Sequence, residues 1–179
     1  MTHTLVSLED IADAAARVRG IARRTPVIPT ALPGLFLKCE NMQPMGAFKM
    51  RGAYNMVAQL PPEVRARGVI TYSSGNHGQA VAMAAQLLGA PAVIVMPETA
   101  PAVKVEGARA YGAEVLFAGR TSFDRKHRAE AIAASRGLAI VPPFDHEWIV
   151  AGQGTVGLEI LEQCPDVTTV YVPVGGGGL

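Results

Sequence analysis

Short apolar runs alternate with longer amphipathic stretches through the middle of the chain. The runs are four or five residues long and rich in Val, Ile and Leu, which predicts buried strands. They are residues 69–72, 92–96, 114–117, 138–141 and 169–172. The stretches between them have helical spacing at residues 76–88, 101–111, 122–136 and 154–163. Strands alternating with helices are typical of right-handed βαβ units, so we expect an α/β fold with a parallel sheet and flanking helices.

The first part of the chain has a different pattern. Ser7 followed three residues later by Asp10 matches a capping box, and the apolar stripe behind it predicts a helix that ends before Gly20. Residues 23–29 contain two prolines and are expected to be extended. The apolar residues 35–37 predict a short buried strand.

Composition narrows the class of protein. The 179 residues are 49% hydrophobic and 17% charged, with a net charge of +1, which excludes a disordered chain and argues against a nucleic-acid binder. The apolar runs are too short for a membrane span, the N-terminus has no signal-peptide pattern, and two cysteines make no disulfide framework. The histidines lack metal-ligand spacing. We therefore expect a cytoplasmic protein without a membrane or nucleic-acid partner.

Four glycines, Gly175–Gly178, follow the last predicted strand. Glycines at this position let backbone N–H groups approach an anion closely, as in a phosphate-binding turn. A helix normally follows such a turn in a βαβ pattern, so we expect the sequence to be the first part of a longer protein. A naturally short chain with a frayed, flexible tail is the alternative.

A second glycine motif, Gly152–Gly157, matches the dinucleotide fingerprint G-x-G-x-x-G. A nicotinamide site needs a strand before the motif and an acidic residue about 20 positions later. Residues 142–148 are poor strand material, and residues 172–177 contain no acid. We therefore favour a loop that opens a helix through close backbone packing, with a nicotinamide oxidoreductase as the competing class.

The loop Ser73–Gly78 lies between a predicted strand and a predicted helix. Ligands in open α/β sheets bind at the carboxyl ends of strands, and hydroxyl, amide and N–H groups at a helix start suit a carboxylate or phosphate. Ordinary capping of the helix by Ser74 or Asn76 is the alternative.

Lys49 stands between Phe48 and Met50 in the first turn of another predicted helix. The helix dipole and an apolar environment both disfavour an ammonium group there and lower its pKa. A neutral amine is what Schiff-base chemistry requires. Without further context, a solvated lysine is the simpler interpretation.

Four motifs in order resemble the serine racemase and threonine dehydratase family, which are pyridoxal-phosphate enzymes of the tryptophan-synthase-β fold. The resemblance spans about residues 25–179 and is nearest to the branch of serine racemase and 3-hydroxyaspartate dehydratase. The motifs are Lys38–Asn41 with Phe48–Ala53, Ser73–Ala80, Ala151–Thr155 and Gly175–Gly178.

The resemblance assigns a role to individual residues. Lys49 would carry pyridoxal 5′-phosphate covalently, Phe48 would pack beside it, and Asn76 would hydrogen-bond the ring hydroxyl of the cofactor. Ser74 would exchange the second proton in a racemase. The phosphate would be bound by Gly175, Gly176, Gly177, Gly178 and the N–H of Leu179. The substrate carboxylate would be received by Ser73, Ser74, Gly75, Asn76 and His77.

The implied reaction is dehydration and deamination of threonine, serine or 3-hydroxyaspartate to a 2-oxo acid and ammonia. Serine or aspartate-type racemisation on the same site is one alternative, and a non-catalytic truncated fragment is another. Many relatives have Ser where this chain has Ala47. By the resemblance, that change removes a hydroxyl near the substrate carboxylate and therefore bears on which substrate is bound.

The resemblance also implies a two-domain pyridoxal-phosphate fold of type II with an incomplete large domain. Residues 1–59 would begin the large domain, residues 60–145 would form the small domain, and residues 146–179 would return to the large one. The family further suggests a homodimer and a divalent cation bound by residues beyond Leu179.

Overall fold

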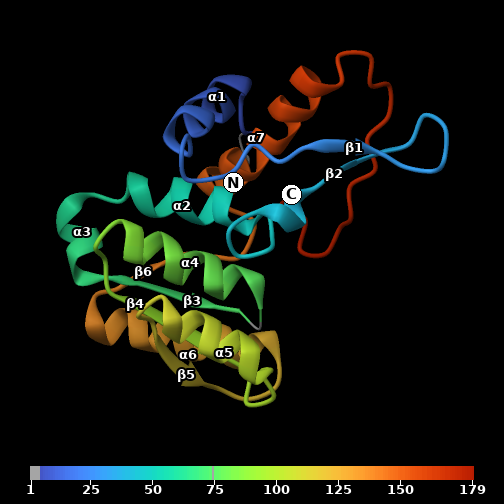
Figure 1. Cartoon of the computed structure of the whole chain (residues 1–179). Helices are drawn as coiled ribbons and strands as arrows, with labels where there is room; N and C mark the ends of the chain where they lie inside the picture. The colour runs from blue at the N-terminus through green and yellow to red at the C-terminus, as the bar shows by residue number, and fades with distance from the viewer. Residues whose placement is uncertain (1–4, 74) are drawn as a thin grey trace.

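A four-stranded parallel sheet forms the lower half of the molecule in the view of Figure 1. The structure is a computed structural model that describes residues 5–73 and 75–179. The strand order is β5-β4-β3-β6. The strands are β3 (Val69–Tyr72), β4 (Ala92–Met96), β5 (Glu114–Phe117) and β6 (Ala139–Ile140). The prediction of an α/β fold with a parallel sheet and flanking helices is therefore confirmed.

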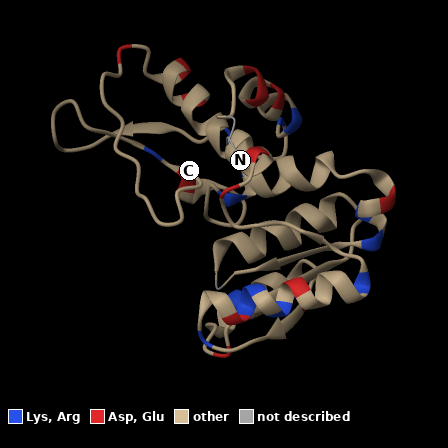
Figure 2. Cartoon of the chain, turned by 180° about the vertical axis from the view of Figure 1, so that it is seen from behind, with Lys and Arg blue, Asp and Glu red and all other residues tan. Residues whose placement is uncertain are grey.

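Helices cover both faces of the sheet, and the side chains of each strand point alternately to one face and to the other. On β4, Ile94 and Met96 pack in the larger core, whereas Val93 and Val95 pack against the opposite helix. In Figure 2 the two central strands, β3 and β4, carry no charged residues, whereas the helices carry many. The larger core contains α4 (Asn76–Leu87) and α5 (Ala102–Ala110), and the smaller one contains α6 (Ser122–Arg136).

Three further helices lie above the sheet and its α4 layer in Figure 1. They are α1 (Leu8–Arg17), α2 (Lys49–Gln59) and α7 (Glu147–Gln163), and a short helix α3 (Pro62–Arg67) leads from α2 into the sheet. Helix α2 packs against α4 on one side and α7 on the other. Helix α2 therefore lies in the middle of the molecule, between α4 and α7. Among the described residues, every helix is too short or too polar to span a lipid bilayer.

The capping box predicted at the first helix is confirmed. Ser7 Oγ accepts the N–H of Asp10, and the Asp10 carboxylate accepts the N–H of Ser7. The same reciprocal arrangement joins Thr121 and Asp124 at the start of α6. These caps satisfy N–H groups that a helix start leaves without intrahelical partners.

Helices α2 and α7 cross at two glycines. A Cβ atom on Gly152 would lie 2.6 Å from the Cα of Gly52, and one on Gly52 would lie 2.7 Å from the carbonyl oxygen of Ile149. The predicted loop at residues 152–157 is wrong, because α7 begins at Glu147 and the whole glycine motif lies inside the helix. Close backbone packing is the role of Gly152, but between two helices and not beside a nucleotide.

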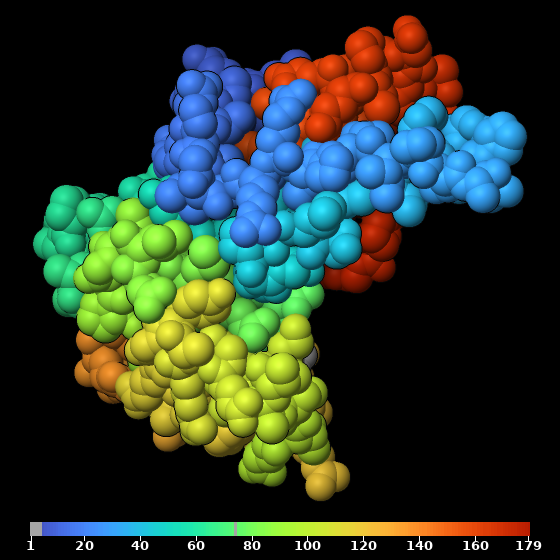
Figure 3. Space-filling view, in the orientation of Figure 1, coloured from blue at the N-terminus to red at the C-terminus, as the bar shows by residue number. Residues whose placement is uncertain are grey.

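An antiparallel hairpin projects from the upper half of the molecule (Figure 3). It consists of β1 (Val27–Pro29) and β2 (Phe36–Lys38), and the short helix η1 (Glu40–Met42) follows it. The prediction of a buried strand at residues 35–37 is wrong in its burial, because Phe36 and Leu37 are each 52% exposed. The apolar character of residues 35–37 predicted a strand, but the burial of a strand depends on which other elements pack against it.

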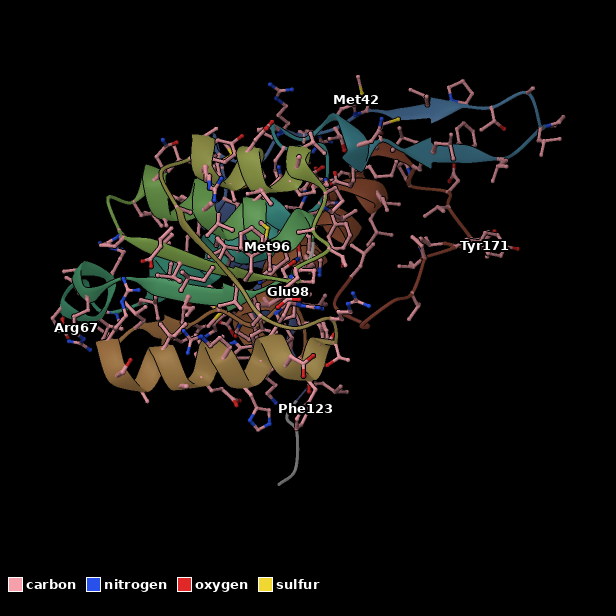
Figure 4. All side chains as sticks on the ribbon, turned by 90° about the horizontal axis from the view of Figure 1, so that it is seen from below. Met42, Arg67, Met96, Glu98, Phe123 and Tyr171 are labelled. Atoms are coloured by element: carbon pink, nitrogen blue, oxygen red, sulfur yellow. The ribbon has the colours of Figure 1, made fainter. Side chains whose placement is uncertain are left out.

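Residues 169–172 do not form the predicted strand. Tyr171 is 86% exposed, and Figure 4 places it on an open segment away from the sheet. A strand needs a neighbour that accepts and donates its backbone hydrogen bonds, and no strand of the described residues pairs with this segment.

Two prolines, Pro142 and Pro143, follow β6 after one intervening residue, Val141. The N–H of Val141 still donates to the carbonyl of Ile70, but neither proline has an N–H to continue the ladder. The carbonyl groups of this segment remain available as acceptors for side chains of α2 and α4.

His77, in the first turn of α4, is buried against this segment. Its Nε2 lies 3.2 Å from the carbonyl oxygen of Val141, which can only accept, so Nε2 carries the proton. Burial, with a smaller contribution from the nearby Lys49 ammonium, lowers the pKa of His77 to about 4. The imidazole is therefore neutral at pH 7.

The helix crossing predicts the effect of adding a methyl group at Gly152. Gly152→Ala should lower the free energy of unfolding by about 1–3 kcal/mol, because the new Cβ would overlap the backbone of α2. Gly157→Ala, in the same helix with open space around it, should stabilise by about 0.5–1 kcal/mol through helix propensity. Urea unfolding of both variants measures the difference, and equal effects would contradict the crossing.

The buried histidine predicts a pH dependence. Its folded pKa lies below the value of about 6.5 for the unfolded chain, so the unfolded state binds a proton first as the pH falls. Stability should decrease below pH 6.5 and lose about 3 kcal/mol from this group by pH 4. His77→Gln should flatten this part of the curve in denaturant titrations across pH 4 to 7. His127→Gln, on the exposed side of α6, should leave the pH dependence of stability unchanged. A wild-type slope in H77Q would show that His77 is not its cause.

Candidate functional site

Lys49 begins α2, as the sequence predicts, and its amine is half-buried. Nζ donates a 2.7 Å hydrogen bond to the carbonyl oxygen of Pro143 and lies 5.1 Å from the centre of the Phe48 ring. Desolvation by burial lowers the pKa of Lys49. The amine is thus held at a fixed point and is more easily neutralised than an exposed lysine.

The glycine turn at residues 175–178 comes close, through Gly178, to the carbonyl that holds Lys49. A Cβ atom on Gly178 would lie 3.7 Å from the Pro143 oxygen, and Gly178 itself is buried. A Cβ on Gly176 would lie 2.4 Å from the ring of Phe144, and Gly177 has a φ of +80°. Side chains would therefore collide at Gly176, and the backbone of the turn needs glycine at Gly177.

One extended segment, residues 141–144, joins these groups. Its carbonyls at Val141 and Pro143 accept from His77 and Lys49, and Phe144 packs against the glycine turn. Three sites that are far apart in the sequence, the lysine, the loop after β3 and the glycine turn, are therefore gathered around a single stretch of backbone.

The loop after β3 leads directly into α4. The N–H of Gly75 lies 3.2 Å from Ser73 Oγ, and Gly75 is the N-cap residue. Ser74, one of the predicted caps and site residues, lies outside the described residues. Asn76, the other predicted cap, does not cap α4: its Oδ1 accepts a 2.7 Å hydrogen bond from Lys104 Nζ. Within the described part of the loop, the N-terminal N–H groups of α4 are not occupied by a capping side chain.

Not every predicted site residue is enclosed. His77 and Gly178 are buried, and Phe48 and Lys49 are partly buried, whereas Asn76 and Leu179 are exposed. Two hollows next to α1 do not include Lys49. One is lined by Asp13, Asn55 and Trp148, and the other by Arg19, Thr155 and Glu162. The position of the reactive amine, and not the shape of a cavity, therefore locates this site.

Sequence reasoning missed a buried charge network next to Lys49. Arg51, only 1% exposed, hydrogen-bonds both carboxylate oxygens of Glu40 and both of Glu159. Glu159 also accepts from Lys38. The network places two cations against two carboxylates and connects α2, η1, β2 and α7. No local pattern could reveal it, because its members are up to 121 residues apart.

The electrostatics of the network favour its charged form. Burial acts to raise the pKa of Glu40, but hydrogen bonds from Arg51, Thr25 and Gln43 outweigh it and lower that pKa. Burial likewise acts to lower the pKa of Arg51, and the two carboxylates raise it. Both groups are therefore ionised in the folded protein at neutral pH, and α2 is tied at its start to the elements around it.

The residues present fit a cofactor that has both an aldehyde and a phosphate. A half-buried amine with a lowered pKa can form an imine, and a turn that disfavours side chains at Gly176, Gly177 and Gly178 offers backbone N–H groups to an anion. Among the described residues, no group of three or more His, Cys, Asp or Glu side chains is arranged to hold a metal ion.

Comparisons with known proteins agree with this chemistry. The family model "Pyridoxal-phosphate dependent enzyme" matches residues 18–179. The chain is 44% identical to L-threo-3-hydroxyaspartate ammonia-lyase of Saccharomyces cerevisiae, over 95% of this chain and 54% of that protein. It is 46% identical to the catabolic L-threonine dehydratase TdcB of Staphylococcus aureus, over 99% of this chain and 54% of that protein.

The fold agrees as well. The structure of maize serine racemase matches with a TM-score of 0.94 and 41% identity, covering 98% of this chain and 55% of that one. The chain thus spans about half the length of the relatives it matches. The sequence-based recognition is confirmed, and pyridoxal phosphate is the cofactor that the family implies. With the family model matching nearly the whole chain around the lysine and glycine turn described above, this chain belongs to the pyridoxal-phosphate dependent enzymes.

Proposed function

We propose that this chain carries the cofactor-binding part of an enzyme that eliminates water from a β-hydroxy amino acid and, after hydrolysis of the dehydrated product by water, yields a 2-oxo acid and ammonia. The observation that carries the proposal is the Lys49 amine, half-buried and held on Pro143 beside the glycine turn. The names of the relatives support the reaction class, since two of them are a threonine dehydratase and a 3-hydroxyaspartate ammonia-lyase.

Lys49 has two tasks in this proposal. Its amine would hold the cofactor, and Nζ, once released by the substrate amine, would take the proton from the substrate Cα. Bound pyridoxal phosphate supplies an electron sink for the charge left on that carbon. Burial of Lys49 favours the neutral amine that both tasks need, because a protonated amine can neither attack an aldehyde nor accept a proton.

The two ends of the site bind anions. Gly175–Gly178 and the N–H of Leu179 hold the cofactor phosphate, and Phe48 packs beside the cofactor. The substrate carboxylate binds the loop of Ser73, Ser74, Gly75, Asn76 and His77 at the start of α4, where N–H groups and the helix dipole favour negative charge. Neutral His77 keeps this end of the site without an added charge of its own.

Racemisation is the second candidate on the same site. The similarity to maize serine racemase favours it, as does the Ser73-Ser74 pair in the loop. In this alternative Ser74 returns a proton to Cα from the side opposite Lys49. The nicotinamide alternative loses its basis, because the Gly152–Gly157 motif lies within α7 and not after a strand.

The organisation of the whole protein remains part of the proposal. We assign residues 1–59 and 146–179 to a large domain and residues 60–145 to a small domain that closes over the substrate. A homodimer and a divalent cation bound outside this chain complete the proposal, with threonine, serine and 3-hydroxyaspartate as candidate substrates. Buried Ala47, in place of the serine of many relatives, favours the 3-hydroxyaspartate and serine branch.

Borohydride reduction tests the lysine. Protein incubated with pyridoxal 5′-phosphate and reduced should carry the label on the peptide containing Lys49, because this amine is the one positioned beside the glycine turn. Peptide mass spectrometry locates the label. Lys49→Ala should abolish it, and Lys126→Ala, on exposed α6, should not. A label on Lys38, Lys104 or Lys126, or none at all, would refute the proposed function; no label would favour the non-catalytic fragment.

Ser74 separates the two reactions. Ser74→Ala should reduce racemisation at least about a hundredfold, the scale of a lost general acid, while dehydration falls much less. Chiral chromatography of serine and 3-hydroxyaspartate measures the first rate, and 2-oxo acid release measures the second. Equal loss of both rates would remove Ser74 from the two-base role, and Ser73→Ala is the matched control.

A further inference from the structure

Helices α4 and α5 meet at an interlocked set of four residues beside the loop after β3. Asn76 and Gln79 lie one turn apart on α4, and Lys104 and Gly107 lie one turn apart on α5. Lys104 Nζ is 2.7 Å from Asn76 Oδ1 and 3.5 Å from Gln79 Oε1. A Cβ atom on Gly107 would lie 1.8 Å from Gln79 Nε2, so the missing side chain makes room for Gln79.

The chemistry of this contact fixes the orientation of the Asn76 amide. An ammonium group has three hydrogens to donate and no lone pair to accept, so only the oxygen of an amide can face it. With Oδ1 on Lys104, the Nδ2 hydrogens of Asn76 must point away from α5. Without such a partner, the two ends of an exposed asparagine amide are nearly equivalent and can exchange by rotation.

We propose that Lys104 is a positioning residue: it holds Asn76 with its N–H donors turned toward the cofactor side of the loop. The inference rests on the proposed function and on the role that the family resemblance implies for Asn76, which is to donate a hydrogen bond to the ring oxygen of pyridoxal phosphate. An oxygen that bears negative charge requires a donor, and an amide turned the other way would present its own oxygen and repel it. The nearby ammonium adds a positive charge that favours the ionised ring oxygen.

The orientation is testable without cofactor. In two-dimensional ¹⁵N NMR spectra of the protein, Lys104→Met should move the side-chain N–H resonances of Asn76, assigned by their loss in Asn76→Ala. Lys104→Arg, which keeps a cationic donor, should leave them near their wild-type positions. Gly107→Ala serves as the packing control: it displaces Gln79 while both Lys104 and Asn76 are kept, so it should shift the Asn76 resonances less than K104M does. Unchanged Asn76 resonances in K104M would overturn the proposal.

The consequence for the cofactor is measured by absorption. With pyridoxal phosphate bound, K104M should raise the pH midpoint of the visible band by about one unit, because the ring oxygen loses a donor and a neighbouring cation and becomes more basic. K104R should restore the midpoint. An unchanged midpoint in K104M would overturn the positioning role even if the amide moves. A wild-type protein that forms no band at Lys49 would refute the proposed function, and the NMR comparison would still decide the orientation of Asn76.

Discussion

A guanidinium in the core determines which side chains can surround it, because arginine stays protonated and keeps its charge even when it is buried. Arg51 therefore requires carboxylates nearby, and Glu40 and Glu159 supply them from opposite directions. Removing one partner from such a set commonly costs about 3–5 kcal/mol, since a buried charge is left uncompensated. The four-charge network thus fixes where α2 starts, and Lys49 stands two residues before Arg51.

The same helix is fixed at a second point by shape. Gly52 and Gly152 let α2 and α7 approach until backbone meets backbone, and α4 packs on the other side of α2. The ion pairs of Arg51 thus position the start of α2, and the close contact with α7 positions the following residue, Gly52. Because α2 is packed between α4 and α7, the helix that carries the Lys49 amine is rigidly placed. A covalent cofactor site needs this rigidity.

Sequence patterns predicted those features that depend on neighbouring residues. The strands β3 to β5, the caps of α1 and the lysine at the start of α2 follow from periodicity and local hydrogen bonding. Features that depend on distant partners were missed or wrong. Glu159 and Lys104 gave no local signal, the exposure of Phe36 depends on which elements pack against the hairpin, and Gly152 matched a fingerprint whose spacing also suits a helix crossing.

The paired prolines after β6 have a consequence beyond the site. In the described sheet, β6 is an edge strand, and a free edge is a template for another chain to pair with. Pro142 and Pro143 offer no donors, and Lys49 and His77 already use the carbonyls on either side of Pro142. At Pro142 and Pro143 an incoming strand would therefore find no backbone N–H donor, so the residues that gather the lysine and the histidine also disfavour pairing of another chain beyond the end of β6.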